Sequence, residues 1–215
     1  MKQKHIPFLA IRPALLIMLL SMIAIFSCKD SSGSKTAAKA EDDKSGIPAD
    51  LSKMVMEDIA GTDTKYARQM TSTGVIEIEG YVRNNQKTGQ WILYTPEGDV
   101  SQINNYVDGK LEGVALHMAY RNQVDQRANY LHGVLHGPWL GYKFGKIVEE
   151  RNYKNGQLDG AVKIYDERTF KLKQEAEYKD GLQDGFFRYY DENGNVTLEY
   201  EYKKGEKISG GMKNQ

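Results

Sequence analysis

The residues with the most evident capacity for chemistry in this chain of 215 residues are two histidines, His132 and His136. On a helix, a spacing of four residues would place both imidazoles on one face, where they could bind a metal ion. Here they stand beside glycines, in positions that other segments fill with acids or amides: Asp108, Asn155 and Asp180 for the first, and Glu112, Asp159 and Asp184 for the second. This pattern indicates ordinary polar turn residues, and we predict no metal site.

Acidic residues form a second group, because the same turns carry a row of carboxylates: Asp108, Glu112, Asp159, Asp180 and Asp184. The row could meet a cation or a cationic partner, or it could consist of solvated turn tips. The sequence has no nucleophile–base pairing and no phosphate-binding glycine loop that opens a helix. We therefore predict no catalytic residue, no cofactor and no small-molecule substrate, and thus a protein that is not an enzyme. The 29 basic and 29 acidic residues balance, which argues against a nucleic-acid partner.

The only cysteine, Cys28, directly follows an apolar stretch. Lys2, Lys4 and Arg12 precede this stretch, which runs over residues 14–26. It is shorter than the roughly 20 residues of a membrane span and has the length of a signal-peptide core. We predict a signal peptide over residues 1–27; the alternative is an uncleaved anchor with an incidental cysteine.

The segment Ile25-Phe26-Ser27-Cys28 resembles a bacterial lipobox. This resemblance implies that Cys28 is acylated, with palmitate among the chains, and becomes the new amino terminus. Lys29 stands where Asp would resemble an inner-membrane retention signal, so the resemblance implies an outer-membrane lipoprotein, on the periplasmic face or the cell surface. Residues 28–50 are rich in Ser, Lys, Ala and Asp, and we expect a flexible tether.

A repeated phrase, Tyr-x-x-Gly-x-x-x-Gly, must position any site in the remainder of the chain. It occurs four times, at Tyr106–Gly109–Gly113, Tyr130–Gly133–Gly137, Tyr153–Gly156–Gly160 and Tyr178–Gly181–Gly185. A truncated copy begins at Tyr202 and a degenerate copy at Tyr81, and the tyrosines of the full copies lie 23 to 25 residues apart. A fixed period of this size is typical of a repeat architecture, which offers an extended surface more often than one special pocket.

Each repeat has the signals of a β-hairpin. An aliphatic residue precedes every repeat tyrosine by six positions, and apolar residues, most of them large, follow the second glycine by two and by five. The glycines indicate a wide turn at one rim, while Pro96-Glu97-Gly98-Asp99 and Glu192-Asn193-Gly194-Asn195 indicate turns at the other. We predict an all-β fold, an antiparallel meander of hairpins in one open, twisted sheet over residues 75–211. Residues 51–74 would be a capping segment with a short helix and a loop, and residues 212–215 a tail.

The segments Tyr153–Gly160 and Tyr178–Gly194 resemble the bacterial variant of the MORN repeat, in which tyrosine, two glycines, an aromatic and an Asx-Glu-Asn-Gly turn recur. Proteins with such repeats are often grouped with the YwqK-type family, which is labelled as antitoxin. The resemblance implies a MORN-like repeat sheet that binds protein. We expect an unidentified envelope protein as the partner of a scaffold or interaction surface, or, as the alternative, a toxin that acts in the envelope and is masked by the sheet.

Overall fold

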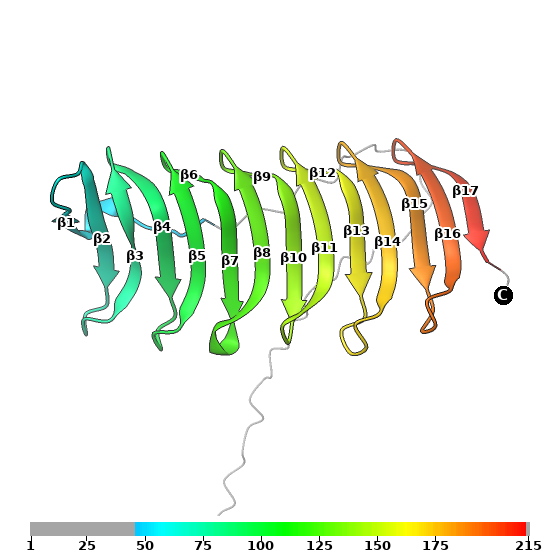
Figure 1. The fold of residues 1–215 in the computed structure, drawn as a ribbon, viewed down its shortest axis with the longest axis horizontal. Coiled ribbons are helices and arrows are strands. Elements are labelled where there is room, and N and C mark those ends of the chain that lie inside the picture. The colour runs from blue at the N-terminus through cyan, green and yellow to red at the C-terminus, as the bar shows by residue number, and fades with distance from the viewer. Residues whose placement is uncertain (1–45, 214–215) are drawn as a thin grey trace, which may run out of the picture. The chain divides into compact units, whose positions relative to one another are not determined.

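A computed structural model describes residues 46–213 of the chain, which form one open sheet (Figure 1). The expected signal peptide, Cys28 and most of the expected tether lie outside the described residues, as do residues 214 and 215. The described strands are all antiparallel and pair in chain order, with no crossover between them. The predicted all-β class and the single open antiparallel meander are confirmed.

The sheet contains 17 strands. They are β1 (Val55–Asp58), β2 (Thr64–Met70), β3 (Ile76–Arg83), β4 (Gln86–Tyr94), β5 (Val100–Val107), β6 (Lys110–Leu111), β7 (Gly113–Ala119), β8 (Gln123–Leu131), β9 (Val134–Leu135), β10 (Gly137–Lys143), β11 (Lys146–Lys154), β12 (Gln157–Leu158), β13 (Gly160–Tyr165), β14 (Leu172–Lys179), β15 (Leu182–Tyr190), β16 (Val196–Lys203) and β17 (Glu206–Met212). The two-residue strands β6, β9 and β12 continue after a kink as β7, β10 and β13, and both parts pair with the preceding strand. We call β1–β10 the N-terminal half and β11–β17 the C-terminal half.

The first glycine of each phrase lies in a tight turn, so the expected wide turn is wrong. In the turn after β8, for example, the two central residues, His132 and Gly133, have φ of 53° and 86°. Two positive values in a two-residue loop are the signature of a type I′ hairpin, which favours Asn, Asp and Gly. The Gly133 amide also donates to the carbonyl of Leu111 in the preceding repeat at 2.8 Å, so the turn ties successive repeats together.

The second glycine lies at the kink between the two parts of a strand. Gly137 and Gly160 have φ of 90° and 113°, a region that other residues occupy only with strain. Gly137 pairs with Tyr153 of the next strand, and a Cβ at this position would lie 3.8 Å from the Cβ of Asn129. At the kink after β12, the side-chain amide of Asn152 donates to the carbonyl of Ala161 at 3.3 Å. The two glycines therefore do separate work, one in the turn and one in the strand.

The turns at the opposite rim differ from repeat to repeat. The Thr95–Asp99 turn closes with Gly98 at φ 89°, as expected for a three-residue loop. In the middle of the sheet, by contrast, bulky residues occupy positive φ: Phe144 at 53° and Phe170 at 58°. The left-handed region costs a residue with a side chain roughly 1–2 kcal/mol, and Phe144 is nevertheless 76% exposed.

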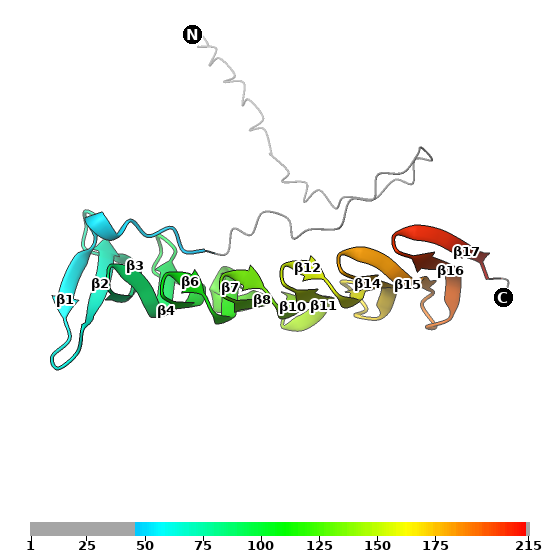
Figure 2. The same ribbon diagram turned by 90° about the horizontal axis from the view of Figure 1, so that it is seen from above.

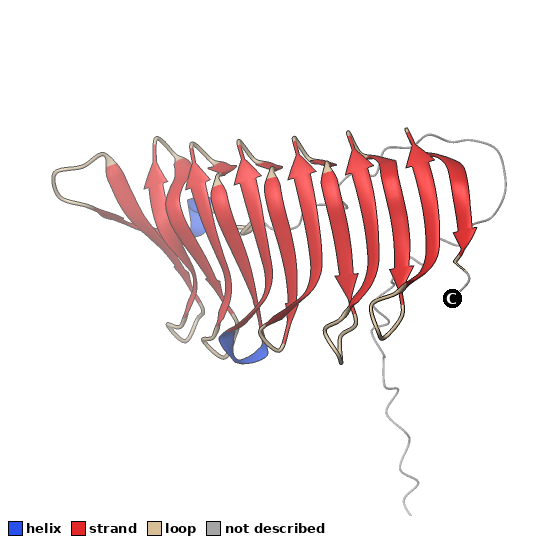
Figure 3. Ribbon diagram, turned by 45° about the vertical axis from the view of Figure 1, so that its right-hand side comes forward, coloured by secondary structure: helices blue, strands red, loops and turns tan. Residues whose placement is uncertain are grey.

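Residues 51–74 do not form the expected capping helix. Only one turn of 3-10 helix, η1 (Leu51–Lys53), is present, and β1 and β2 then extend the sheet as a hairpin (Figure 3). A second short 3-10 segment, η2 (Tyr120–Asn122), joins β7 to β8. Tyr66 of β2 pairs with Tyr81 of β3, so β2 continues the sheet beyond the degenerate first repeat. The pairing surface of β3 accounts for the difference, because it favours an extended partner over an isolated short helix.

The end of the expected tether is also ordered. Residues 46–54, which we call the strap, lie against one side of the sheet (Figure 2). Ile47 is 1% exposed, and its amide donates to the hydroxyl of Tyr106 at 2.9 Å. The Lys87 ammonium donates to the carbonyl of Ile47 and lies 5.2 Å from the centre of the Trp91 ring. The predicted tether therefore includes too many residues at its carboxyl end, because burial of Ile47 holds this segment against the sheet.

The hydrophobic core lies between the strap and the face of the sheet that we call the core face. Trp91 is fully buried there, with its ring edge towards Tyr106 at a centroid distance of 6.3 Å. Gly80 makes room for it, because a Cβ at that position would lie 2.2 Å from the Trp91 ring. The core cluster ends at Tyr153 of β11, with Leu158 of β12 packed against it, so β13–β17 have no equivalent cover among the described residues.

Candidate functional site

The residues singled out by the repeated phrase are packing and turn positions. Tyr106, Tyr130 and Tyr153 are buried on the core face, with 4%, 4% and 6% of their surface exposed, and Tyr178 is half-buried. Each buried tyrosine pairs in register with a leucine of the following short strand: Leu111, Leu135 and Leu158. Sequence reasoning missed these leucines, although their constant offset of five residues from the tyrosine could have identified them.

His132 and the acidic row lie at the rim of the type I′ turns. The Glu112 carboxylate accepts the His132 amide at 2.8 Å and lies 3.3 Å from its Nδ1. Asp184 accepts from Lys203 at 2.9 Å, and this hydrogen bond lowers the pKa of Asp184. Each of these two carboxylates thus accepts hydrogen bonds from the turn of the next repeat. Within residues 46–213, no group of three or more His, Cys, Asp or Glu side chains could hold a metal ion.

The opposite side of the sheet, the outer face, carries a line of residues that face one another from strand to strand. We call it the transverse row, and strand pairing places eleven residues in it: Glu79, Ile92, Ile103, Leu116, Arg127, Leu140, Glu150, Lys163, Glu175, Arg188 and Glu199. From Ile92 to Leu140 the row is apolar except for Arg127. From Glu150 onward the sign of charge alternates at every step. The outer face is therefore chemically divided between the two halves.

Ion pairs hold the charged part of the row together. Arg188 Nε lies 2.8 Å from the Glu199 carboxylate, and its Nη1 lies 4.0 Å from Glu175. Lys163 Nζ lies 3.9 Å from Glu175 on the other side. The hydrogen bond that Arg188 donates to Glu199 raises the pKa of Arg188. Opposite charges that face each other across strands stabilise a sheet modestly, and half-burial reduces their screening by salt.

Tyrosine hydroxyls add a second interaction to the row. Tyr94 donates to Glu79 and Tyr165 donates to Glu150, each at 2.5 Å, and Tyr190 donates to Glu175 at 3.1 Å. In each pair the tyrosine lies two residues beyond the strand partner of the glutamate. Burial, followed by the hydrogen bond to the carboxylate, raises the pKa of Tyr94 and of Tyr165 to about 12. The sequence pattern indicated these tyrosines only as apolar strand positions, and it did not predict their hydrogen bonds to glutamates.

A depression in the outer face interrupts this pattern in the N-terminal half. Its lining residues come from β7, β8, β10 and the turn after β10: Leu116, Gln123, Val124, Arg127, Tyr142, Phe144 and Gly145. Arg127 pairs in register with Leu116 on one side and Leu140 on the other. Besides its apolar groups, the depression therefore contains one guanidinium group, one phenol hydroxyl and the side-chain amide of Gln123.

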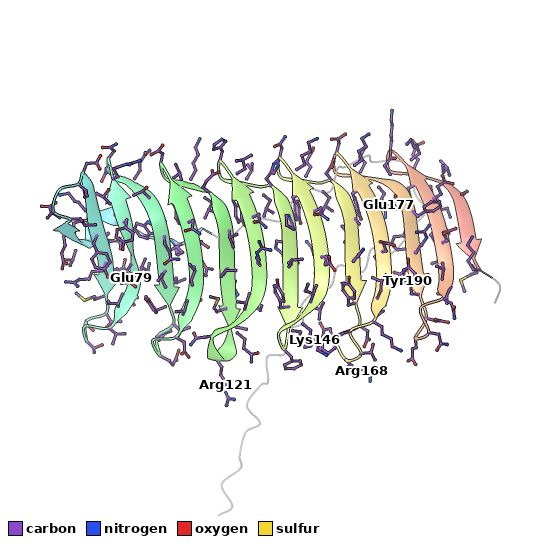
Figure 4. The ribbon with its side chains drawn as sticks, in the orientation of Figure 1. Glu79, Arg121, Lys146, Arg168, Glu177 and Tyr190 are labelled. Carbon is purple, nitrogen blue, oxygen red and sulfur yellow. The ribbon has the colours of Figure 1, made fainter. Side chains whose placement is uncertain are left out.

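Basic residues lie at the neighbouring rim. Figure 4 shows Arg121, Lys146 and Arg168 at turns on the same rim of the sheet. Lys146 Nζ lies 4.5 Å from the centre of the Phe170 ring, a distance at which a cation is attracted by an aromatic face. The rim near the depression thus combines aromatic and cationic side chains with Glu167, which forms an ion pair with Lys143.

Comparisons with protein-family models and with curated proteins find no match for this chain. Among residues 46–213, no helix is long and apolar enough to cross a membrane.

Proposed function

We propose that this chain is a non-enzymatic lipoprotein of the bacterial cell envelope whose MORN-like repeat sheet binds a partner protein. The observation that carries the proposal is the outer face. It presents a regular transverse row over the length of an open sheet, and no described segment covers it. A long, ordered face with a change from apolar to charged residues suits contact with another protein along several repeats.

The proposed anchor rests on the sequence. Cys28 follows the apolar stretch at the position where a lipobox cysteine would be acylated. Several acyl chains would hold the protein stably on a membrane, because one chain alone binds only marginally. The position of Lys29 supports the outer membrane as the location. The residues between Cys28 and the strap would then act as a spacer between lipid and sheet.

A substitution tests the anchor directly. Cys28→Ala should abolish acyl labelling and either release the protein from membranes or leave it as an unprocessed precursor. Metabolic labelling with a palmitate analogue and membrane fractionation measure these outcomes. Unchanged labelling in the variant would refute the lipid attachment.

Crosslinking from intact envelopes tests the interaction surface. The wild-type chain should capture a defined protein, and Leu116→Glu combined with Leu140→Glu should reduce that capture, because both changes place charge in the apolar part of the row. The matched control is Val107→Glu at the opposite rim, where the side chain is 51% exposed. Equal capture by all three chains would exclude the outer face as the binding surface.

The alternative is an antitoxin or immunity-type protein that masks a toxin acting in the envelope. The similarity of Tyr178–Gly194 to the repeats of the YwqK-type family favours it. Expression of the chain should then protect cells against that toxin, and a toxin gene beside its own would support the assignment. Lack of protection on challenge would eliminate this alternative.

A further inference from the structure

Equivalent positions on the outer face differ in one repeat in a way that indicates a binding site. Each position consists of two residues. The first belongs to the transverse row, and the second lies two residues after the row residue of the next strand; Tyr94, for example, lies two residues after Ile92, the strand partner of Glu79. Three copies combine glutamate with tyrosine, as Glu79–Tyr94, Glu150–Tyr165 and Glu175–Tyr190 do. One copy is apolar, with Ile103 and Met118. The remaining copy combines Arg127 with Tyr142, so a cation stands where the others supply a carboxylate.

Arg127 has no carboxylate from the described part of the chain. Within residues 46–213, neither Arg127 nor Tyr142 forms a side-chain hydrogen bond or an ion pair. The two neighbours of Arg127 in the transverse row are Leu116 and Leu140, and the alternation of charge along the row begins only at Glu150. Arg188, the other arginine in the row, lies between two glutamates. A guanidinium group carries five donors in a planar fork that fits a carboxylate, and residues 46–213 supply no carboxylate to Arg127.

Apolar and aromatic side chains surround Arg127 in the depression. Leu116, Val124 and the ring of Phe144 line the same depression, together with the amide of Gln123. Phe144 is 76% exposed at the tip of a two-residue turn and has a φ of 53°. Phe144 is thus a large aromatic residue with a strained backbone and a solvent-exposed side chain. This combination points to a binding role.

We propose that this depression binds a carboxylate carried beside an aliphatic side chain, as in an acidic peptide segment of the partner protein. The inference rests on the proposed function and names the chemistry of its contact. Arg127 and the hydroxyl of Tyr142 would donate to the carboxylate, which takes the place that glutamate holds in the Glu–Tyr copies. The aliphatic side chain would pack against Leu116, Val124 and Phe144.

Two matched peptides test the proposal: acetyl-Leu-Glu-Leu-amide and acetyl-Leu-Gln-Leu-amide. The full chain in detergent is titrated with each, and side-chain and amide NMR shifts around Leu116 and Tyr142 are followed. The Glu peptide should bind saturably, and the Gln peptide should bind at least about tenfold more weakly, since it loses the charge-assisted hydrogen bonds. Equal affinity for the two peptides, or no saturable binding by the Glu peptide, would overturn the proposal.

Variants of the chain separate the site from its background. Arg127→Gln should weaken binding of the Glu peptide at least about tenfold, whereas Arg188→Gln, which removes the paired arginine of the same row, should leave it unchanged. Arg127→Glu recreates the Glu–Tyr combination of other copies, so it should keep the fold and abolish binding even where Arg127→Gln proves unstable. Unchanged binding in Arg127→Glu would refute the site.

The proposed function and the proposed site can fail separately. If Arg127→Gln still captures the envelope partner as well as the wild type does, the sheet binds that partner elsewhere and only the site is refuted. If the peptides bind as expected but crosslinking captures no partner that depends on the outer face, the site stands and the proposed function falls.

Discussion

Trp91 in the N-terminal half is completely buried, whereas Phe187, in the equivalent position of the C-terminal half, is only half-buried. The strap explains the difference, because Ile47 covers Trp91 and Tyr106, while no described segment covers Phe187. Phe187 instead packs against rings of its own sheet, with centroid distances of 5.1 Å to Tyr189 and 6.4 Å to Tyr200. One half thus gains a second layer, and the other depends on contacts within a single layer.

The outer face shows the same division. Apolar residues such as Ile92, Ile103 and Leu116 dominate the transverse row in the N-terminal half, while Glu175 and Arg188 belong to the alternating charges of the C-terminal half. A single sheet has little volume in which to bury apolar groups. The comparison teaches that repeats with the same backbone arrangement can be stabilised in two ways, by a cover that excludes water or by lateral pairing of charges and rings.

The largest effect should come from the buried tryptophan. Trp91→Ala should lower the free energy of unfolding by about 3–5 kcal/mol, since it leaves a cavity under the strap. Phe187→Ala should cost about half as much, because less of its surface leaves water on folding. Urea unfolding followed by circular dichroism measures both. Equal losses would contradict the claim that only one half has a covered core.

The strap should contribute the next largest effect. Ile47→Ala should lower the free energy of unfolding by about 2–4 kcal/mol, the usual range for a buried aliphatic residue. Hydrogen exchange should lose protection in β4 and β5 and keep it in β14–β16. The matched control is Ile147→Ala, where the side chain is 36% exposed and the loss should be below about 1 kcal/mol. Uniform loss of protection along the sheet would show that the strap does not act locally.

A smaller effect is expected from the charged row. Arg188→Gln removes the ion pairs with Glu199 and Glu175, and should cost about 1 kcal/mol at low salt and less at high salt. Ile103→Ala, in the apolar part of the same row, should lose stability independently of salt. Parallel urea titrations at two ionic strengths test this. If the loss of unfolding free energy in Arg188→Gln does not depend on salt, ion pairs do not account for the stability of the charged row.

The smallest effect at neutral pH concerns the tyrosine–glutamate pairs and becomes visible only in alkali. The pKa of Tyr165 is raised from 10.0 to about 12 by burial and by its bond to Glu150. The folded state therefore holds this proton more tightly than the unfolded state. Its contribution to stability is complete below pH 10 and is lost as the pH rises from about 10 towards 12.

Unfolding at a series of pH values measures this slope. Tyr165→Phe should flatten it, and Glu150→Gln should reduce it in part, because burial remains after the charge is removed. An unchanged slope in Tyr165→Phe would show that other groups cause the alkaline loss.

Much of the fold was predictable because its signals are local. Asn155-Gly156 and Asp180-Gly181 mark turns within a few residues, and the constant tyrosine spacing predicts equivalent strands. The turn type was missed, because the phrase merges two glycines that act in different places. The short strands β1 and β2 were also missed, since residues 51–74 carry no copy of the phrase and gain their order from pairing with β3.

The candidate site could be predicted only in part. The position five residues after the second glycine, where Tyr142 stands, was identified, but Arg127 was not distinguished from its equivalents. The offset of three residues before each repeat tyrosine, where Ile103, Arg127 and Glu150 stand, was a signal that could have found it. Arg127 is unusual because its partners in the row, Leu116 and Leu140, lie on other strands and carry no charge, and these pairings depend on register.

The sequence by itself determined the repeat, its rims and the order of the strands, because turn residues and period act over short distances. Only the tertiary structure decided what each face carries. It brought Ile47 to Tyr106, 59 residues away, and aligned one residue per strand into the transverse row. Such contacts depend on the register of every intervening strand, and a slip of one residue would exchange the two faces.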